Sequence, residues 1–174
     1  MNEQAGLALW TWSLNVYAAK PVKDALLDVQ NQFGAHVPLI LWAAHAASGD
    51  RAVSLEDARA AKAAISQLSH HTRALREARR HLPVAAQKLP REPRETAIAH
   101  IAEAEIALEQ LELCLLAEQR TRAGAGDPRA TLPGNIEAAL RAAGLDLMKS
   151  PAKTACAALV SVLAAHFTGQ GGKA

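Results

Sequence analysis

The sequence has little of what favours β-structure, disulfides or membrane spans. Val, Ile, Tyr, Phe and Thr, which suit a half-buried pleated surface, are sparse, whereas the helix formers Ala and Leu dominate the hydrophobic residues. The two cysteines, Cys114 and Cys156, have no CxxC spacing and are too few for a disulfide framework, which indicates a reducing compartment. The longest apolar runs, 37–44 and 155–160, fall well short of the roughly 20 residues that a spanning helix needs. We therefore expect an all-α protein without membrane insertion. Since the N-terminus also lacks a basic region followed by an apolar stretch, we expect a cytoplasmic location.

Motifs that would identify a catalytic chemistry are also missing. The chain has no His-Glu-x-x-His, no P-loop and no Gly-x-Ser-x-Gly, and Gly124-Ala-Gly126 lacks the third glycine and the preceding strand of a dinucleotide site. Asp24 and Asp28 lie one helical turn apart and could share a face with His36, but a hard metal needs more oxygen ligands. The sequence therefore predicts no catalytic residues, no metal and no cofactor.

Helical periodicity and capping signals predict about seven helices. The expected helices cover residues 6–19, 21–33, 39–48, 55–82, 94–122, 135–143 and 151–167. Ser54 and Asp57 form a capping-box pattern before the first long helix, and Asn135 is expected to cap the sixth. The helix at 39–48 is apolar on nearly every side, which is typical of a helix buried in the core. No segment shows a convincing strand pattern.

These helices are expected to form one domain over residues 1–168. The long helices, about 55–82 and 94–122, should form an antiparallel pair packed with five shorter helices. The expected parts are an aromatic-rich region (1–50), a long helix hairpin (51–123), C-terminal helices (129–168) and a disordered tail (169–174). Residues 124–128, which contain two glycines and a proline, are expected to be flexible.

Charge is distributed unevenly between the two long helices, although the net charge is only +2. Residues 51–94 hold ten basic and four acidic residues, whereas residues 95–119 hold six glutamates and no Lys or Arg. One interpretation is a basic ridge of Arg73, Arg76 and Arg80 for an acidic partner. The other is that the two helices are antiparallel neighbours whose flanking charges face each other and specify their orientation. Because the two blocks cancel at long range, nucleic-acid binding is not expected.

Five of the six aromatic residues lie in the first 42 positions. These are Trp10, Trp12, Tyr17, Phe33 and Trp42. Trp10 and Trp12 lie about 200° apart on a helix and so cannot face the same side. The cluster either fills the space between three short helices or lines a pocket or interface, roles that suit an apolar ring with a polar tip. His45 interrupts the apolar helix and is either a hydrogen-bonded core residue or a ligand contact.

The aromatic region also carries a resemblance. The segments Leu9–Tyr17, Pro21-Val22, Ala25–Gln30 and Gly34–Trp42 resemble a family of small proteobacterial proteins of unknown function, named as conserved hypothetical proteins. The similarity is specific over residues 7–50. It implies a bacterial, cytoplasmic, all-helical protein and carries no catalytic residues with it.

Two binding roles follow from these features. The first is a non-enzymatic helical accessory or adaptor protein that binds a protein partner, a homodimer also being open. The second is a small-molecule-binding or regulatory domain with a pocket among the first three helices. The candidate binding residues are Trp10, Trp12, Tyr17, Trp42, His45, Arg73, Arg76 and Arg80.

Overall fold

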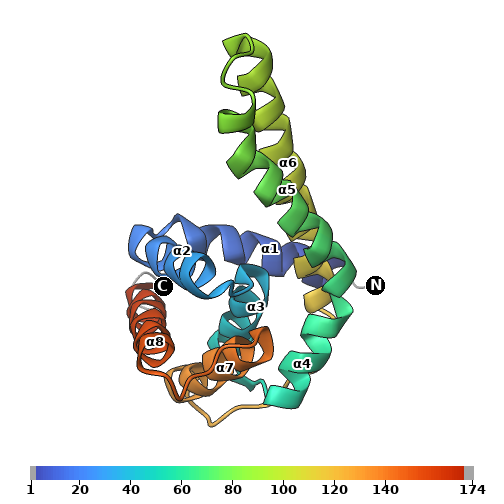
Figure 1. The fold of residues 1–174 in the computed structure, drawn as a ribbon. Coiled ribbons are helices and arrows are strands. Elements are labelled where there is room, and N and C mark those ends of the chain that lie inside the picture. Colours follow the sequence, from blue (N-terminus) through green and yellow to red (C-terminus); the bar gives the residue numbers. More distant parts are fainter. Residues whose placement is uncertain (1–2, 171–174) are drawn as a thin grey trace.

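A computed structural model describes residues 3–170 and contains eight α-helices in that range (Figure 1). The helices are α1 (Glu3–Ala18), α2 (Lys20–Phe33), α3 (Val37–Ser48), α4 (Leu55–Ala64), α5 (Ser66–Ala85), α6 (Arg91–Leu116), α7 (Pro128–Ala143) and α8 (Ser150–Gln170). The all-α class is thus confirmed, with one helix more than expected. No helix in the described range is long and apolar enough to cross a membrane.

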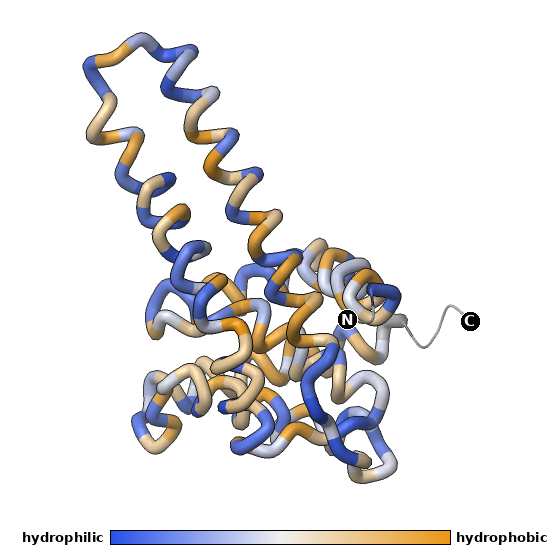
Figure 2. Tube along the Cα trace, turned by 90° about the vertical axis from the view of Figure 1, so that its right-hand side faces the viewer, coloured by the Kyte–Doolittle hydropathy of each residue, from blue (hydrophilic) through white to orange (hydrophobic). Residues whose placement is uncertain are grey.

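The molecule has two parts. Six helices form a body, from which α5 and α6 project together as an antiparallel hairpin (Figures 1 and 2). In the hairpin, apolar and polar residues alternate along both helices (Figure 2). The long antiparallel pair that the sequence predicts is therefore present.

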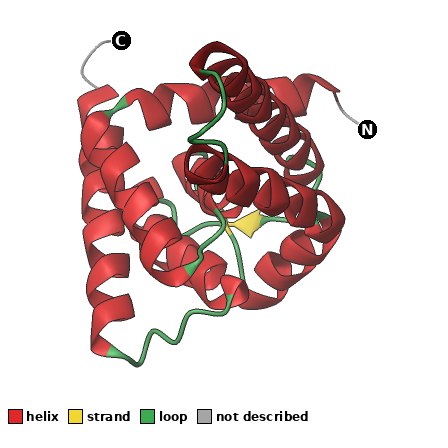
Figure 3. Cartoon of the chain, turned by 45° about the horizontal axis from the view of Figure 1, so that its top comes forward, coloured by secondary structure: helices red, strands yellow, loops and turns green. Residues whose placement is uncertain are grey.

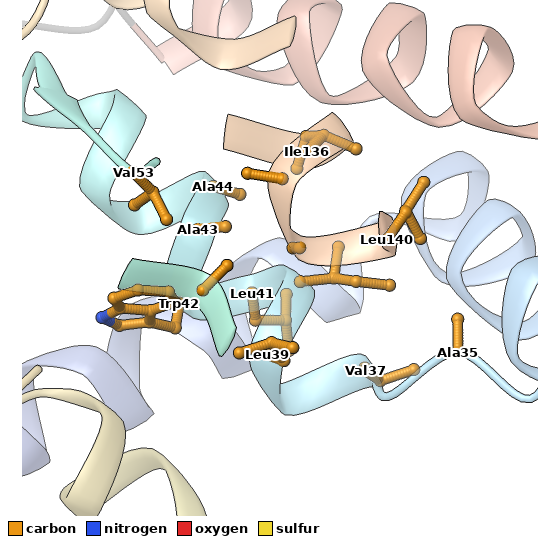
Figure 4. Close-up of a cluster of buried hydrophobic side chains, with 14 of the residues drawn as sticks. Ala35, Val37, Leu39, Leu41, Trp42, Ala43, Ala44, Val53, Ile136 and Leu140 are labelled. Carbon is orange, nitrogen blue, oxygen red and sulfur yellow. The ribbon is translucent and has the colours of Figure 1, made fainter. Parts of the chain in front are cut away.

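Helix α3 forms the centre of the body. Ten of its twelve residues are buried, as expected for a helix that is apolar on nearly all sides. Its main partner is α7, and Figure 4 shows buried side chains of both helices in one cluster, among them Leu39, Trp42, Ile136 and Leu140. α8 packs against α2 and α7. Apolar burial on this scale is the main stabilising contribution to the body.

The first long helix differs from the prediction because it is interrupted at Ile65. The backbone there has φ −97° and ψ 1°, outside the helical range, and the Ile65 side chain is fully buried. The break lets α4 pack against α7 while α5 packs against α6. Tertiary packing thus overrides the continuous helix propensity of 55–82. The predicted capping box at the start of α4 is present, since Ser54 Oγ accepts a hydrogen bond from the backbone N–H of Asp57 (3.1 Å).

The second long helix ends at Leu116, six residues before the predicted end. The chain beyond it forms a short antiparallel pairing, in which β1 (Arg51–Ala52) joins β2 (Arg122–Ala123) near the middle of the molecule (Figure 3, yellow). The sequence predicts no strand because two residues are too few to show a β pattern. Their pairing also depends on contacts between segments about seventy positions apart.

The segment after β2, expected to be flexible, is held by Asp50. Its carboxylate accepts hydrogen bonds from the backbone N–H of Gly126 (2.8 Å) and from Thr131 Oγ1 (2.7 Å), and its carbonyl accepts one from the N–H of Gly124 (2.9 Å). Asp50 has a left-handed φ of 49°, which short polar side chains tolerate better than most. These bonds fix the approach to α7.

Helix α7 begins at Pro128, with Asp127 as its N-cap, so the prediction that Asn135 caps this helix is wrong. Asn135 lies inside the helix and is buried. Its Oδ1 accepts a hydrogen bond from the Val53 N–H (2.8 Å), and its Nδ2 donates to the carbonyls of Ala43 (3.0 Å) and Arg51 (2.8 Å). One amide side chain thus links α7 to α3 and β1.

The C-terminal helix begins at Ser150-Pro151 as predicted and continues to Gln170. Of the tail predicted over 169–174, residues 171–174 lie outside the described residues.

Candidate functional site

A cavity of about 500 Å³ lies where the hairpin leaves the body, bounded by α1, α2, α3, α5 and α6. This volume is in the range of sites that hold small organic ligands. The lining residues are Trp10, Ser13, Leu14, Tyr17, Leu27, Gln30, Asn31, Val37, Pro38, Leu41, Arg76, Arg79, Arg80, Ala102, Glu105, Ile106, Glu109 and Leu113.

Helical spacing explains why these residues meet. Trp10, Ser13, Leu14 and Tyr17 follow the i, i+3, i+4, i+7 pattern and so lie on one face of α1. The lining residues of α2, α5 and α6 follow the same pattern on their own helices. The cavity is therefore formed by one face of each helix around it, and these faces mix apolar and charged residues.

An ion-pair network forms the wall of the cavity on the hairpin side. Arg76 Nε donates to Glu105 (2.7 Å), Arg76 Nη2 donates to Glu109 (2.6 Å), and Arg79 Nε donates to the second oxygen of Glu105 (2.9 Å). The side chains of Arg76 and Glu105 are only 13% and 8% exposed, so these pairs are screened by solvent far less than ordinary surface pairs. They join α5 to α6 at the wall of the cavity.

The two carboxylates of this wall have pKa values displaced in opposite directions. Burial alone raises the pKa of Glu105, but the hydrogen bonds from Arg79 and Arg76 outweigh burial and hold this pKa below its ordinary value. Burial raises the pKa of Glu109, with Arg76 only partly opposing it. Burial also raises the pKa of Tyr17 across the cavity.

A second group of hydrogen-bonded polar side chains is centred on Glu112 of α6. Glu112 is fully buried and lies three positions after Glu109; its two oxygens contact His36 Nε2 (2.6 Å) and the Thr72 hydroxyl (2.7 Å). Both side-chain oxygens thus have partners, as buried polar atoms require. This contact joins α6 to α5 and to the segment between α2 and α3.

Ser13 is the polar group of the cavity that the fold leaves unsatisfied. The residue is 3% exposed, and its hydroxyl is the one buried side-chain polar atom without a hydrogen-bond partner in the described part of the chain. Buried polar groups are nearly always paired, because an unpaired one costs about 1–3 kcal/mol. Ser13 lines the cavity, although its hydroxyl itself is buried.

Residues 8–116 match the model of a family described as "Protein of unknown function (DUF2390)". The chain belongs to this family. No curated protein and no solved structure matches the chain. The family match confirms the resemblance noted over 7–50 and extends it through α6, while the expected proteobacterial origin stays a prediction. It includes every residue that lines the cavity and the whole ion-pair network, whereas α7 and α8 lie beyond it.

A larger hollow of about 820 Å³ lies along α7, α8 and the loop between them. All but one of its lining residues fall outside the family match, and the hollow has no unpaired buried polar atom. Cys156 lines it, and burial raises the pKa of this thiol, which makes it a weak nucleophile. The cavity at the base of the hairpin is therefore the better candidate site of this family member.

The structure brings four of the eight predicted binding residues into the cavity: Trp10, Tyr17, Arg76 and Arg80. Arg73 is exposed on α5 and does not line the cavity. Arg73, Arg76 and Arg80 do not form one exposed ridge, because Arg76 faces α6 and is engaged by its glutamates. The alternative interpretation, in which charges of the two helices face each other, describes the contacts of Arg76.

The other three candidates lie elsewhere. Trp42 is 3% exposed in the core of the body. Trp12 faces away from the cavity, as the spacing from Trp10 requires, and packs edge-on against His45 and Phe167 at centroid distances of 5.1 and 6.3 Å. Burial lowers the pKa of His45 and so favours the neutral ring in this contact.

Several site residues were missed by sequence reasoning. They are Ser13, His36, Thr72, Arg79, Glu105, Glu109 and Glu112. The spacing of the three glutamates places them on one face of α6, but the same spacing describes a solvated face of an exposed helix. Only the position of α5 distinguishes these cases.

In residues 3–170, no three His, Cys, Asp or Glu side chains come close enough to hold a metal ion. Asp24, considered above with Asp28 and His36, pairs with Lys20 on the surface of α2, while His36 turns to Glu112.

Proposed function

We propose that this protein binds a small molecule in the cavity at the base of the α5–α6 hairpin. The observation that carries the proposal is a cavity of suitable size whose wall includes Ser13, a buried residue with an unpartnered hydroxyl. A rotation of the Ser13 side chain would bring this hydroxyl to a ligand polar group, and the new hydrogen bond would remove its desolvation cost.

The apolar rim of the cavity supports the same role. Leu14 and Ile106 line the cavity and are 50% and 52% exposed, although both are large apolar residues. Trp10 and Tyr17 present ring surface beside them. Covering this surface with a ligand would be favourable by about 25 cal/mol for each Å² of apolar area removed from water.

A cavity-filling substitution tests the proposal. Ala102 lines the cavity, whereas Ala104 is exposed on the same helix, so Ala102→Phe should fill the site and Ala104→Phe serves as the matched control. Native mass spectrometry of protein purified from its own host should show a bound small molecule on the wild type and on Ala104→Phe, but not on Ala102→Phe.

Circular dichroism of both variants must first show wild-type helicity. The proposal is wrong if the wild type carries no bound molecule, or if Ala102→Phe retains it in full.

A second proposal is the adaptor role, in which the hairpin binds a protein partner. It is supported by the projection of the hairpin beyond the body (Figure 1) and by two exposed apolar residues near its tip, Val84 (70%) and Leu89 (63%). The double variant Val84→Asp/Leu89→Asp should lose a partner that wild-type protein retains in pull-downs from host lysate. Retention of the same partner by the double variant would exclude the tip as the contact.

The cytoplasmic location stays a prediction.

A further inference from the structure

We infer that the ligand of the cavity is a monocarboxylate with an apolar body, whose carboxylate binds the guanidinium of Arg80. This inference rests on the proposed function and adds the chemical class of the ligand.

The charges around the cavity point to an anion. Three arginines and two glutamates line it, and the positive charges of Arg76 and Arg79 are engaged by Glu105 and Glu109. Arg80 differs from them: its Nη2 donates to the neutral Oδ1 of Asn31 (2.7 Å), a contact that leaves its charge uncompensated. A guanidinium has five donors in a fork that matches a carboxylate, so Arg80 keeps donors for a second partner.

The position of Arg80 fits the role of an anchor at the entrance. Both Arg80 and Asn31 are exposed while lining the cavity, which places this charge at its mouth. Lys23 lies over the ring of Tyr17, which lines the cavity, with Nζ 5.5 Å from the ring centroid. It adds a second positive charge near the site. A ligand cation would meet these charges unfavourably, and a neutral ligand would leave the charge of Arg80 without a counter-charge.

The remainder of the site requires an apolar body on the same molecule. Trp10, Leu14 and Ile106 offer apolar surface, and beside them lies Ser13, whose buried hydroxyl has no partner. One uncompensated positive charge beside a mainly apolar wall matches one negative charge on an apolar chain or ring. A polyanion would instead meet Glu105 and Glu109, which are held in place by their ion pairs.

Three probes of equal chain length separate charge from apolar binding: octanoate, 1-octanol and octylammonium. Titration calorimetry should show octanoate binding to the wild type about threefold more tightly than 1-octanol, since an exposed ion pair contributes affinity of this order. Octylammonium should bind most weakly.

The variants Arg80→Gln and Arg73→Gln locate the charge. Arg80→Gln should weaken octanoate binding about threefold and leave 1-octanol binding unchanged. Arg73 is exposed on the same helix and lies outside the cavity, so Arg73→Gln should change neither the octanoate nor the 1-octanol affinity. Ala102→Phe should abolish the binding of both.

The results separate the carboxylate inference from the proposed small-molecule site. Equal affinity for octanoate and 1-octanol, or no effect of Arg80→Gln, overturns the carboxylate inference and leaves the small-molecule site intact if Ala102→Phe still blocks binding. If octanoate does not bind, or if Ala102→Phe leaves its binding unchanged, the inference also fails. The proposed function is then decided separately by the mass of the co-purified ligand on wild type and Ala102→Phe.

Discussion

The centre of the body and the projecting hairpin are both helix pairs, yet they are held together by different interactions. α3 buries ten of its twelve residues, nearly all apolar, against α7 and its other neighbours. In α5 the buried residue is Thr72, and two of the four buried residues of α6 are the glutamates Glu105 and Glu112. The body is therefore stabilised by the hydrophobic effect, whereas the base of the hairpin depends on partly buried ion pairs and hydrogen bonds.

This difference has a consequence for the cavity. Ion pairs specify which faces of two helices meet, but they add little free energy once the desolvation of the charges is counted. The wall of the cavity is thus well oriented but should be less stable than the core of the body. Elements that bind ligands are commonly drawn from such regions of lower local stability. Three pairs of variants test how far this contrast holds.

The largest effect is expected from truncating a core leucine. Leu39 is fully buried, so Leu39→Ala should lower the free energy of unfolding by about 3 kcal/mol through lost burial and the cavity left behind. The matched hairpin variant Leu111→Ala, at a residue that is 51% exposed, should change it by no more than about 0.5 kcal/mol. Urea unfolding of the three proteins gives both values. Similar losses in the two variants would contradict the contrast.

A smaller and more local effect is expected from Arg76→Gln. The substitution leaves Glu109 without its partner and Glu105 with only Arg79, which should cost about 2 kcal/mol. Hydrogen exchange should accelerate in α5 and α6 and stay unchanged in α3 and α7. Arg73→Gln is the control, because this arginine is exposed on the same helix. Uniform acceleration across the protein would show that hairpin and body unfold as one unit.

The smallest effect concerns pH. Burial lowers the folded-state pKa of His45 below its ordinary value of 6.5. The unfolded chain therefore binds this proton more tightly, so the stability contribution of neutral His45 is complete above about pH 6.5 and is lost as the pH falls through the folded pKa. When the pH is lowered from about 7.5 to about 5.5, the urea concentration at the unfolding midpoint should decrease. This decrease should be smaller in His45→Gln than in the wild type.

The hairpin carboxylate Glu105 acts in a lower pH range. Because its folded pKa lies below the ordinary value of 4.5, its contribution to stability is retained above about pH 4.5 and is lost only as the pH falls through the folded pKa.

The control for the His45 prediction is His100→Gln, at an exposed histidine of α6, which should leave the decrease of the urea midpoint unchanged. If His45→Gln shows the same fall as the wild type, this histidine does not cause it.

Local sequence determined most of the helices. Pro21, Gly34, Ser54 and Ser150-Pro151 mark the helix ends where the structure has them, because caps and fixed backbone angles act within a few residues. The apolar character of residues 37–48 likewise determined that α3 is buried. Trp10 and Trp12 had to face opposite sides for the same local reason, namely the period of the helix.

The tertiary structure decided the remaining features, which join segments far apart in the chain. Ile65 leaves the helical range at the point where α4 packs against α7 and α5 packs against α6. Asn135 makes its hydrogen bonds because α3 and β1 lie beside α7. In the cavity, Ser13 is an unpaired hydroxyl and Glu105 a paired carboxylate only after five helices have come together. A sequence determines the face on which a side chain lies, whereas its partners, and with them its charge state and its availability for a ligand, depend on the packing of the whole chain.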